Sequence, residues 1–217
     1  MTRHRAILVV AALLVFASRP VRGDTILASF AGRIFSVDPS LTTQFAVGQS
    51  FSGTYSFDTE ASDIGFPLDP LDAQYVLLIL SVTVDGYVAT GSNPFILISN
   101  DPVGDFYFLF DQSPAGAQVG TLDLVEIIVD LLDTEGTLFS DDTLPASVSL
   151  AAFELRNLIL LFSAEEASVV GEVTSLTFGP GPQPTPEPSA GLLLGGALAV
   201  LAWRRSRQGP LSARSRR

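Results

Sequence analysis

Between Asp24 and Phe178 the apolar residues come in short runs, and this spacing is the feature that most limits how the chain can fold. Runs rich in Val, Ile, Leu, Phe and Thr are broken by Gly, Asp, Asn, Ser or Pro about every 8–12 residues, the spacing of antiparallel sandwiches and barrels. No fixed period repeats, which argues against a solenoid or a tandem array. We therefore predict an all-β domain, a single antiparallel β-sandwich of jelly-roll type.

The clearest unit in this domain is a hairpin between Tyr75 and Thr90. Asp85-Gly86 supplies a two-residue turn between two alternating apolar stretches, which is a strong hairpin signal. On the first strand of this hairpin, four residues are expected to share one face: Leu78, Leu80, Val82 and Val84. The hairpin indicates antiparallel pairing.

Further stretches have the composition and length of strands. They are Ile26–Val37, Ser50–Phe57, Phe95–Ser99, Asp105–Phe110, Leu124–Leu131, Phe153–Ser163 and Ser168–Phe178. The run at 124–132 could instead be helical, because periodicity alone does not distinguish a short apolar strand from a short buried helix.

The N-terminus has the three parts of a signal peptide. A short basic start, Met1–Arg5, is followed by the apolar run Ala6–Ala17 and by a Val21-Arg22-Gly23 sequence suited to cleavage. The apolar run is too short for a membrane span, which needs roughly twenty residues. We expect residues 1–23 to be removed, so that the mature chain begins at Asp24.

The C-terminus begins with a spacer and continues with a second apolar run. Residues 179–188 have proline at every second position, which removes backbone donors and favours an extended linker. Residues 189–207 hold a short Gly/Ala/Leu run that ends at Trp203 and a cluster of arginines, and a basic tail follows at 208–217. The arginines favour the cytoplasmic side, so this segment is expected to span the membrane with the domain outside.

Together these C-terminal residues resemble the PEP-CTERM sorting signal, also called the ice-binding protein C-terminal domain. The resemblance covers Pro184 to Arg207 and rests on these residues: Pro186, Glu187, Pro188, Arg204, Arg205 and Arg207. It implies processing by an exosortase, a membrane transpeptidase that cuts near the Pro-Glu-Pro, and delivery to the cell surface or the exopolysaccharide matrix. The tail from Gln208 to Arg217 is longer than the family pattern.

The middle of the chain resembles, more loosely, a set of PEP-CTERM proteins. The similar stretches are Gly32–Ser40, Ser52–Thr59 and Asp85–Tyr87. The resemblance carries no activity with it. It supports the fold and the export of the domain.

The charges are separated along the chain. Arg33 and Arg156 are the only basic residues between Asp24 and Gln183, against 22 acidic ones, so this region has a formal net charge of −20. Such a charge repels nucleic acid and anionic lipid. We expect no nucleic-acid partner.

The sequence lacks the residues that most catalytic mechanisms need. His4, the only histidine, lies in the signal peptide, and the chain has no Cys and no Lys. Triads, Ser-Lys dyads, Schiff-base chemistry and His/Cys zinc sites are therefore excluded. Two carboxylates suffice for a glycosidase, but nothing in the sequence selects a pair. We expect no enzyme activity and name no catalytic residue.

Binding of calcium or glycan is the alternative to a purely structural role. Calcium prefers oxygen ligands, and its candidate loops are Asp58–Asp63 and Asp133–Glu135 with Asp141-Asp142. Neither loop has the EF-hand spacing, and a solvated acidic surface is the favoured explanation for both. Tyr87, beside the hairpin turn, is the candidate aromatic contact for a glycan. The leading expectation is a non-enzymatic surface or matrix protein associated with the cell envelope or exopolysaccharide, with no resident cofactor.

Overall fold

The computed structural model of the chain describes residues 23–65, 71–101, 103–163 and 167–181. The predicted sorting helix and basic tail lie outside these residues, as does the signal peptide apart from Gly23. A compact unit spans Arg22–Gln183.

Within the described residues the regular elements are strands and two short 3-10 turns, η1 (Pro39–Leu41) and η2 (Leu150–Ala152). The strands are β1 (Thr25–Val37), β2 (Ser50–Asp58), β3 (Asp72–Val76), β4 (Ile79–Val84), β5 (Tyr87–Thr90), β6 (Phe95–Asp101), β7 (Gly104–Asp111), β8 (Ala115–Gly116), β9 (Leu124–Asp133), β10 (Leu155–Phe162) and β11 (Ser168–Pro180). The all-β prediction is confirmed.

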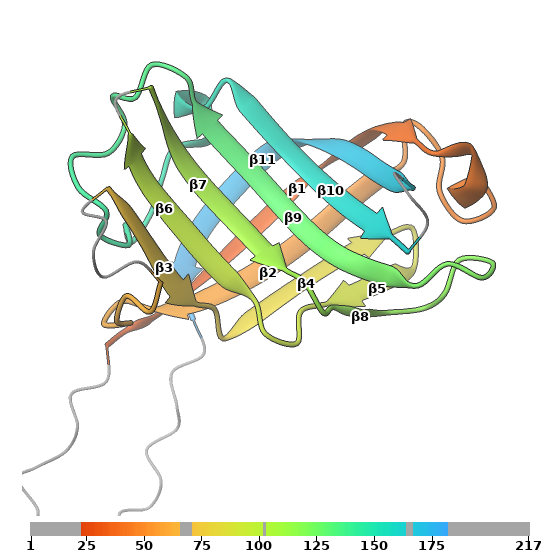
Figure 1. Cartoon of the computed structure of the whole chain (residues 1–217), viewed down its shortest axis with the longest axis horizontal. Helices are drawn as coiled ribbons and strands as arrows, with labels where there is room; N and C mark the ends of the chain where they lie inside the picture. Colours follow the sequence, from red (N-terminus) through yellow and green to blue (C-terminus); the bar gives the residue numbers. More distant parts are fainter. Residues whose placement is uncertain (1–22, 66–70, 102, 164–166, 182–217) are drawn as a thin grey trace, which may run out of the picture. The chain divides into compact units, whose positions relative to one another are not determined.

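All these strands belong to one antiparallel sheet, in the order β3-β6-β7-β9-β10-β11-β1-β2-β4-β5-β8. The sheet curls into a half-barrel, with β6, β7, β9 and β10 in front of β11, β1, β2 and β4 in Figure 1. The predicted jelly-roll sandwich is not confirmed, because β10 is hydrogen-bonded to β11 and the two layers are parts of one sheet. The register of β1 with β11 shifts at Ala31/Gly32 and at Ile34/Ser36, and bulges of this kind bend a strand.

The core fills the concave side of the sheet. Tyr55 on β2 and Tyr107 on β7 are separated by four strands in the sheet order, yet their hydroxyl oxygens lie 2.9 Å apart in the interior. In another part of the interior, the ring of Tyr87 packs edge-on against that of Phe45, with ring centroids 5.0 Å apart, and it also contacts Phe162. These contacts hold the two layers face to face.

The predicted hairpin forms with a different first strand. Asp85 and Gly86 both have positive φ, 43° and 84°, the signature of a type I′ turn. Leu80, Val82 and Val84 face the core as predicted, whereas Leu78 is 58% exposed. The chain crosses from β3 to β4 there: the Leu77 N–H bonds to Pro94 and the Leu78 N–H to Ser56.

The ambiguous run at 124–132 is a strand, β9 (Leu124–Asp133). It pairs with β7 on one side and with β10 on the other, so its backbone donors and acceptors are used between strands. Tertiary pairing therefore decides an assignment that periodicity left open.

Candidate functional site

A shallow groove lies on the outer surface of the sheet, across β11, β1, β2 and β4. Its cavity volume is about 350 Å³, near the lower end of the roughly 300–1,000 Å³ of small-molecule sites. We call it the hydroxyl groove, because most of its lining residues are Ser or Thr: Ser29, Phe30, Ala31, Ser52, Gly53, Thr54, Ser81, Thr83, Ser175 and Thr177.

Strand register arranges the outward side chains of the groove in two rows that run across the strands. One row is Thr177, Ser29, Thr54 and Ser81; the other is Ser175, Ala31, Ser52 and Thr83. Neighbours in a row are on adjacent strands, about 4.8 Å apart. Ala31 is the one residue of the two rows without a hydroxyl group.

The hydroxyl groups of the groove are almost unused by the fold. Among the described residues, Thr177 is the only groove residue whose side chain bonds within the chain, donating to the Ser29 carbonyl at 3.4 Å. A hydroxyl can donate one hydrogen bond and accept two. The groove therefore presents both donors and acceptors to solvent or to a ligand.

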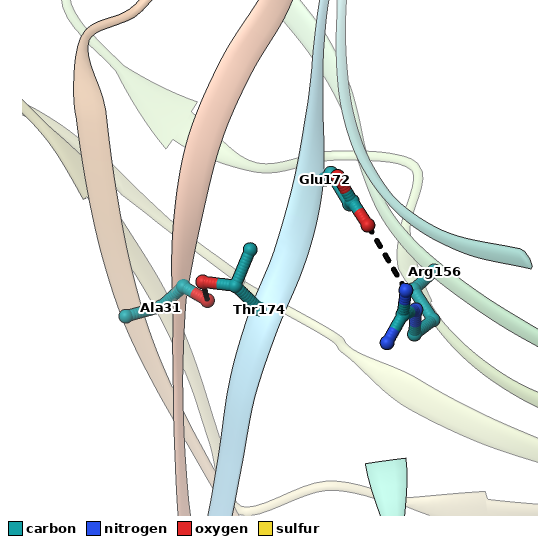
Figure 2. A network of polar contacts seen from close by, with 4 residues as sticks. All are labelled: Ala31, Arg156, Glu172 and Thr174. Atoms are coloured by element: carbon teal, nitrogen blue, oxygen red, sulfur yellow. Dashed lines mark hydrogen bonds and ion pairs between the residues drawn. The ribbon is translucent and has the colours of Figure 1, made fainter. Parts of the chain in front are cut away.

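Two glycines and a bulge shape the sheet under the groove. A Cβ on Gly53 would overlap the ring of Phe30, and one on Gly32 would overlap the Glu172 carbonyl oxygen, so both positions need the close approach that glycine permits. Thr174 is the extra residue of the bulge opposite Ala31 and Gly32, and its hydroxyl donates to the Ala31 carbonyl at 3.4 Å (Figure 2). The bulge accompanies a change in the pairing of β11 with β1.

The groove is electrically neutral although the domain is acidic. No lining residue is charged. Strands β1, β4 and β5 contain no acidic residue, and the acidic residue of β11, Glu172, is paired with Arg156 at 3.0 Å (Figure 2). Arg33 bonds to the Gly48 carbonyl at 3.5 Å. The acidic residues lie mainly on loops and on the other half of the sheet.

The candidate calcium loops use their carboxylates to cap backbone N–H groups. Asp58 Oδ1 accepts from the Glu60 N–H at 2.9 Å, and Asp63 Oδ1 accepts from the Gly65 and Gln74 N–H groups, each at 2.9 Å. Such Asx turns explain acidic residues in loops without a metal. Within the described ranges, no three acidic side chains come close enough to hold a metal ion.

The second candidate loop follows the same pattern. The carboxylate of Asp133 accepts from the Thr137 and Glu135 N–H groups, each at 2.9 Å, and these bonds lower its pKa. Asp141 accepts from the hydroxyl and the N–H of Thr143, which lowers the pKa of Asp141. Calcium binding at either loop stays a prediction.

One buried carboxylate beside this loop is less fully used. Asp105 lies opposite Asp133 in the register of β7 and β9, and both are buried. Asp105 Oδ2 accepts from the Phe139 N–H at 2.7 Å, whereas no described residue bonds to Asp105 Oδ1. A buried carboxylate oxygen without a partner is costly unless a proton, a cation or water satisfies it.

Tyr87 does not form the exposed platform that its position beside the turn suggested. Its side chain is 4% exposed and packs on Phe45 and Phe162 inside the sheet. Burial raises the pKa of Tyr87 to about 12, and its hydroxyl has no partner among the described residues. Successive residues of a strand face opposite sides of the sheet, so the place of Tyr87 in this alternation decides which face it occupies, and its distance from the turn does not.

The predicted sorting signal, Pro186, Glu187, Pro188, Arg204, Arg205 and Arg207, lies outside the described residues. A family model for the PEP-CTERM protein-sorting motif matches residues 184–207 of the chain. The chain is a PEP-CTERM sorting-domain protein. No curated protein and no solved structure matches it.

The PEP-CTERM motif implies export, transient anchoring in the membrane and processing by an exosortase. In the part of the chain that the structure describes, no helix is long and apolar enough to span a membrane. The predicted membrane segment of the PEP-CTERM signal, at 189–207, lies outside that part.

The hydroxyl groove of this PEP-CTERM protein was missed by sequence reasoning, although it leaves a signal. Each of its four strands carries two small residues at positions i and i+2: Ser29 and Ala31, Ser52 and Thr54, Ser81 and Thr83, Ser175 and Thr177. Positions i and i+2 share a face of a strand. The signal becomes a site only when the strand order places the four pairs side by side.

Proposed function

We propose that this PEP-CTERM protein is a non-enzymatic component of the cell surface or exopolysaccharide matrix, and that it contacts neutral glycan through the hydroxyl groove. The observation that carries the proposal is a neutral, hydroxyl-lined concavity on an exported domain that is otherwise strongly acidic. The sorting motif supports export of the domain, and the groove supports a contact with glycan.

The chemistry of the groove suits a polyhydroxylated chain without charge. Sugar hydroxyls both donate and accept hydrogen bonds, as do the Ser and Thr side chains that line the groove. A polyanion would be repelled by a domain of net charge −20. We therefore expect neutral polysaccharide to bind better than acidic polysaccharide.

The groove does not favour the glycosidase alternative. Hydrolysis of a glycosidic bond needs two carboxyl groups about 5–10 Å apart across the bound sugar, and the groove lining contains no acidic residue. The carboxylates of the described loops are held by backbone N–H groups instead. A binding role without turnover is the function that this arrangement supports best.

The test is co-sedimentation of the Asp24–Gln183 domain with exopolysaccharide from the producing organism, separated by anion exchange into neutral and acidic chains. The variant Thr54→Val with Thr83→Val removes two groove hydroxyls and keeps the strand shape. Thr90→Val is the matched control, because Thr90 is exposed on the neighbouring β5, opposite Ser81, and does not line the groove.

We expect saturable binding to the neutral chains, weakened by the Thr54/Thr83 variant and unchanged by the control. If the Thr54/Thr83 variant binds as well as the parent domain, the groove is not the binding site, although the association with the matrix still holds. No binding to either fraction would reject the association with exopolysaccharide itself.

A calcium-binding module is the second candidate, and the buried Asp105 favours it. The Oδ1 of Asp105 has no partner among the described residues, Asp105 is opposite Asp133 in the strand register, and the only basic residues of the domain, Arg33 and Arg156, are engaged elsewhere. If calcium occupies this place, the Tm rises with calcium and falls with chelator, and Asp105→Asn removes that difference. A Tm indifferent to calcium rejects this candidate.

A further inference from the structure

Two buried carboxylates lie opposite each other at one end of the core. The strand register pairs Asp105 of β7 with Asp133 of β9. Asp105 is two residues from the buried Tyr107, and positions i and i+2 of a strand share a face. Asp133 is likewise two residues from the buried Leu131. Directly opposite residues on one face have Cβ atoms about 4.5–5.5 Å apart, so the two carboxylates are close enough to share one cation.

No basic side chain of the domain neutralises this pair. Asp105 and Asp133 are 0% and 4% exposed. The basic residues between Asp24 and Gln183 are Arg33 and Arg156, which bond to the Gly48 carbonyl and to Glu172. Like charges opposite one another in a sheet repel, and a buried charge needs an opposite charge or a metal. A divalent cation would balance both carboxylates.

One oxygen of the pair is left over from the hydrogen bonding of the fold. Asp105 Oδ2 accepts from the Phe139 N–H at 2.7 Å, whereas Asp105 Oδ1 is buried without a partner in the described part of the chain. Asp111, which is equally buried on β7, uses both oxygens, accepting from the N–H groups of Asn93 and Ser113. Capping of backbone N–H groups therefore accounts for Asp111 in full and for Asp105 only in half.

The same two carboxylates hold the connection between β9 and β10, residues 134–154. Apart from η2 it has no regular secondary structure, and connections of this length are uncommon unless they serve a function. Asp133 accepts from the N–H groups of Glu135 and Thr137, and Asp105 from that of Phe139. Its apolar side chains that pack on the core, partly buried, are Leu138, Phe139, Leu144, Val148 and Leu150. A cation on the carboxylates would therefore also fix this connection.

On the basis of the calcium candidate proposed above, we infer that Asp105, Asp133 and Asn100 bind a calcium ion that fastens the 134–154 connection onto the core. Asn100 lies opposite Asp105 in the register of β6 and β7, two residues beyond the buried Ile98. Calcium accepts amide and backbone carbonyl oxygens as well as carboxylates. The site therefore needs no third acidic side chain, and none joins the pair in the described ranges. Magnesium, which requires octahedral geometry and retains water, suits a buried site less well.

Because the chain has no cysteine, one introduced thiol reports whether the connection opens. Leu144→Cys places the thiol in the connection. Leu122→Cys is the control, since Leu122 is also partly buried against the core but precedes β9. The rate of maleimide labelling is measured on the exported protein recovered from producing cells, with calcium chloride, with the same concentration of magnesium chloride, or with EDTA. The Kd for calcium comes from isothermal titration calorimetry.

At a calcium concentration ten times the Kd, the Leu144→Cys thiol should react about tenfold more slowly than in EDTA, because the ion binds only the closed form. The Leu122→Cys thiol should react equally fast in both, and magnesium should protect Leu144→Cys less. Adding Asp105→Asn should abolish the protection by calcium. Adding Asp111→Asn, the matched control, should keep it, because both oxygens of Asp111 are already used.

The outcomes separate this inference from the calcium candidate itself. If calcium raises the Tm and leaves the labelling of Leu144→Cys unchanged, the fastening is overturned and the calcium candidate stands. No response to calcium in either measurement rejects both. Protection that survives Asp105→Asn places the ion elsewhere and overturns the site, and a Tm that rises on acidification but not with calcium shows a shared proton in place of the ion.

A second variant decides the matter if Asp105→Asn does not fold. Asn100→Asp adds a carboxylate beside Asp105 and should lower the Kd for calcium on the order of tenfold, because the charge of the ligands sets calcium affinity. An unchanged Kd in this variant would overturn the ligand assignment.

Discussion

The buried pair of Tyr55 and Tyr107 offers a quantitative test of the curled sheet. The two hydroxyl oxygens are 2.9 Å apart, and the side chains are 1% and 0% exposed. They belong to β2 and β7, which approach one another only because the sheet bends through the four strands between them. Their hydrogen bond therefore reports the closeness of the two layers.

Replacing either tyrosine by phenylalanine leaves the other hydroxyl buried without a partner. Each single replacement should lower the free energy of unfolding by about 1–3 kcal/mol. For a domain of this size, this corresponds to a decrease in Tm of roughly 2–10 °C. Replacing both removes the partnerless group, so the double variant should cost no more than either single one. The expected coupling free energy is about 1–2 kcal/mol.

The measurement is a double-mutant cycle by urea unfolding of the Asp24–Gln183 domain, followed by circular dichroism. Tyr55→Phe combined with Tyr87→Phe is the control, because Tyr87 contacts Phe45 and Phe162 and not Tyr55. That pair should be additive within about 0.5 kcal/mol. Additivity of the Tyr55 and Tyr107 replacements would refute the packing of β2 against β7.

Three further predictions concern the same interior. Gly53→Ala should cost about 1–3 kcal/mol by overpacking against Phe30, measured by urea unfolding, whereas Gly179→Ala, with no atom within 4 Å of its added Cβ, should be near neutral. Tyr87→Phe removes a buried hydroxyl without a described partner, so the Tm should stay or rise; a loss above about 1 kcal/mol would show that the hydroxyl is bonded. The pKa of Tyr87 is raised to about 12 from an ordinary value of 10.0. Since the unfolded state loses this proton first, stability should hold below pH 10 and fall between pH 10 and 12, with a shallower fall in Tyr87→Phe; a urea midpoint that is constant to pH 12 would contradict this.

The local structure could be predicted where residue chemistry alone decides it. The Asp85-Gly86 turn forms because both residues accept positive φ, and β1 begins and ends close to its predicted limits because turn residues flank it. Leu78 was assigned to the wrong face because the chain leaves one layer and enters the other at that point, which periodicity within one strand does not show.

The global arrangement depends on strand pairing, which the sequence does not reveal one segment at a time. A sandwich and a curled sheet have the same inward alternation, and the pairing of Leu158 with Gly171 across β10 and β11 makes the difference between them. The hydroxyl groove could not be predicted for the same reason, because Ser52 and Thr83 become neighbours only when β2 pairs with β4.

The PEP-CTERM motif implies that an exosortase processes the C-terminus of this chain. The most direct measurement is the intact mass of the protein recovered from producing cells, for the parent chain and for a variant with Pro186, Glu187 and Pro188 replaced by alanine. We expect the parent protein to be truncated near Pro186–Pro188, and the variant to keep its C-terminus and stay in the membrane. A parent protein that ends at Arg217, or a variant processed to the same mass as the parent, would contradict it.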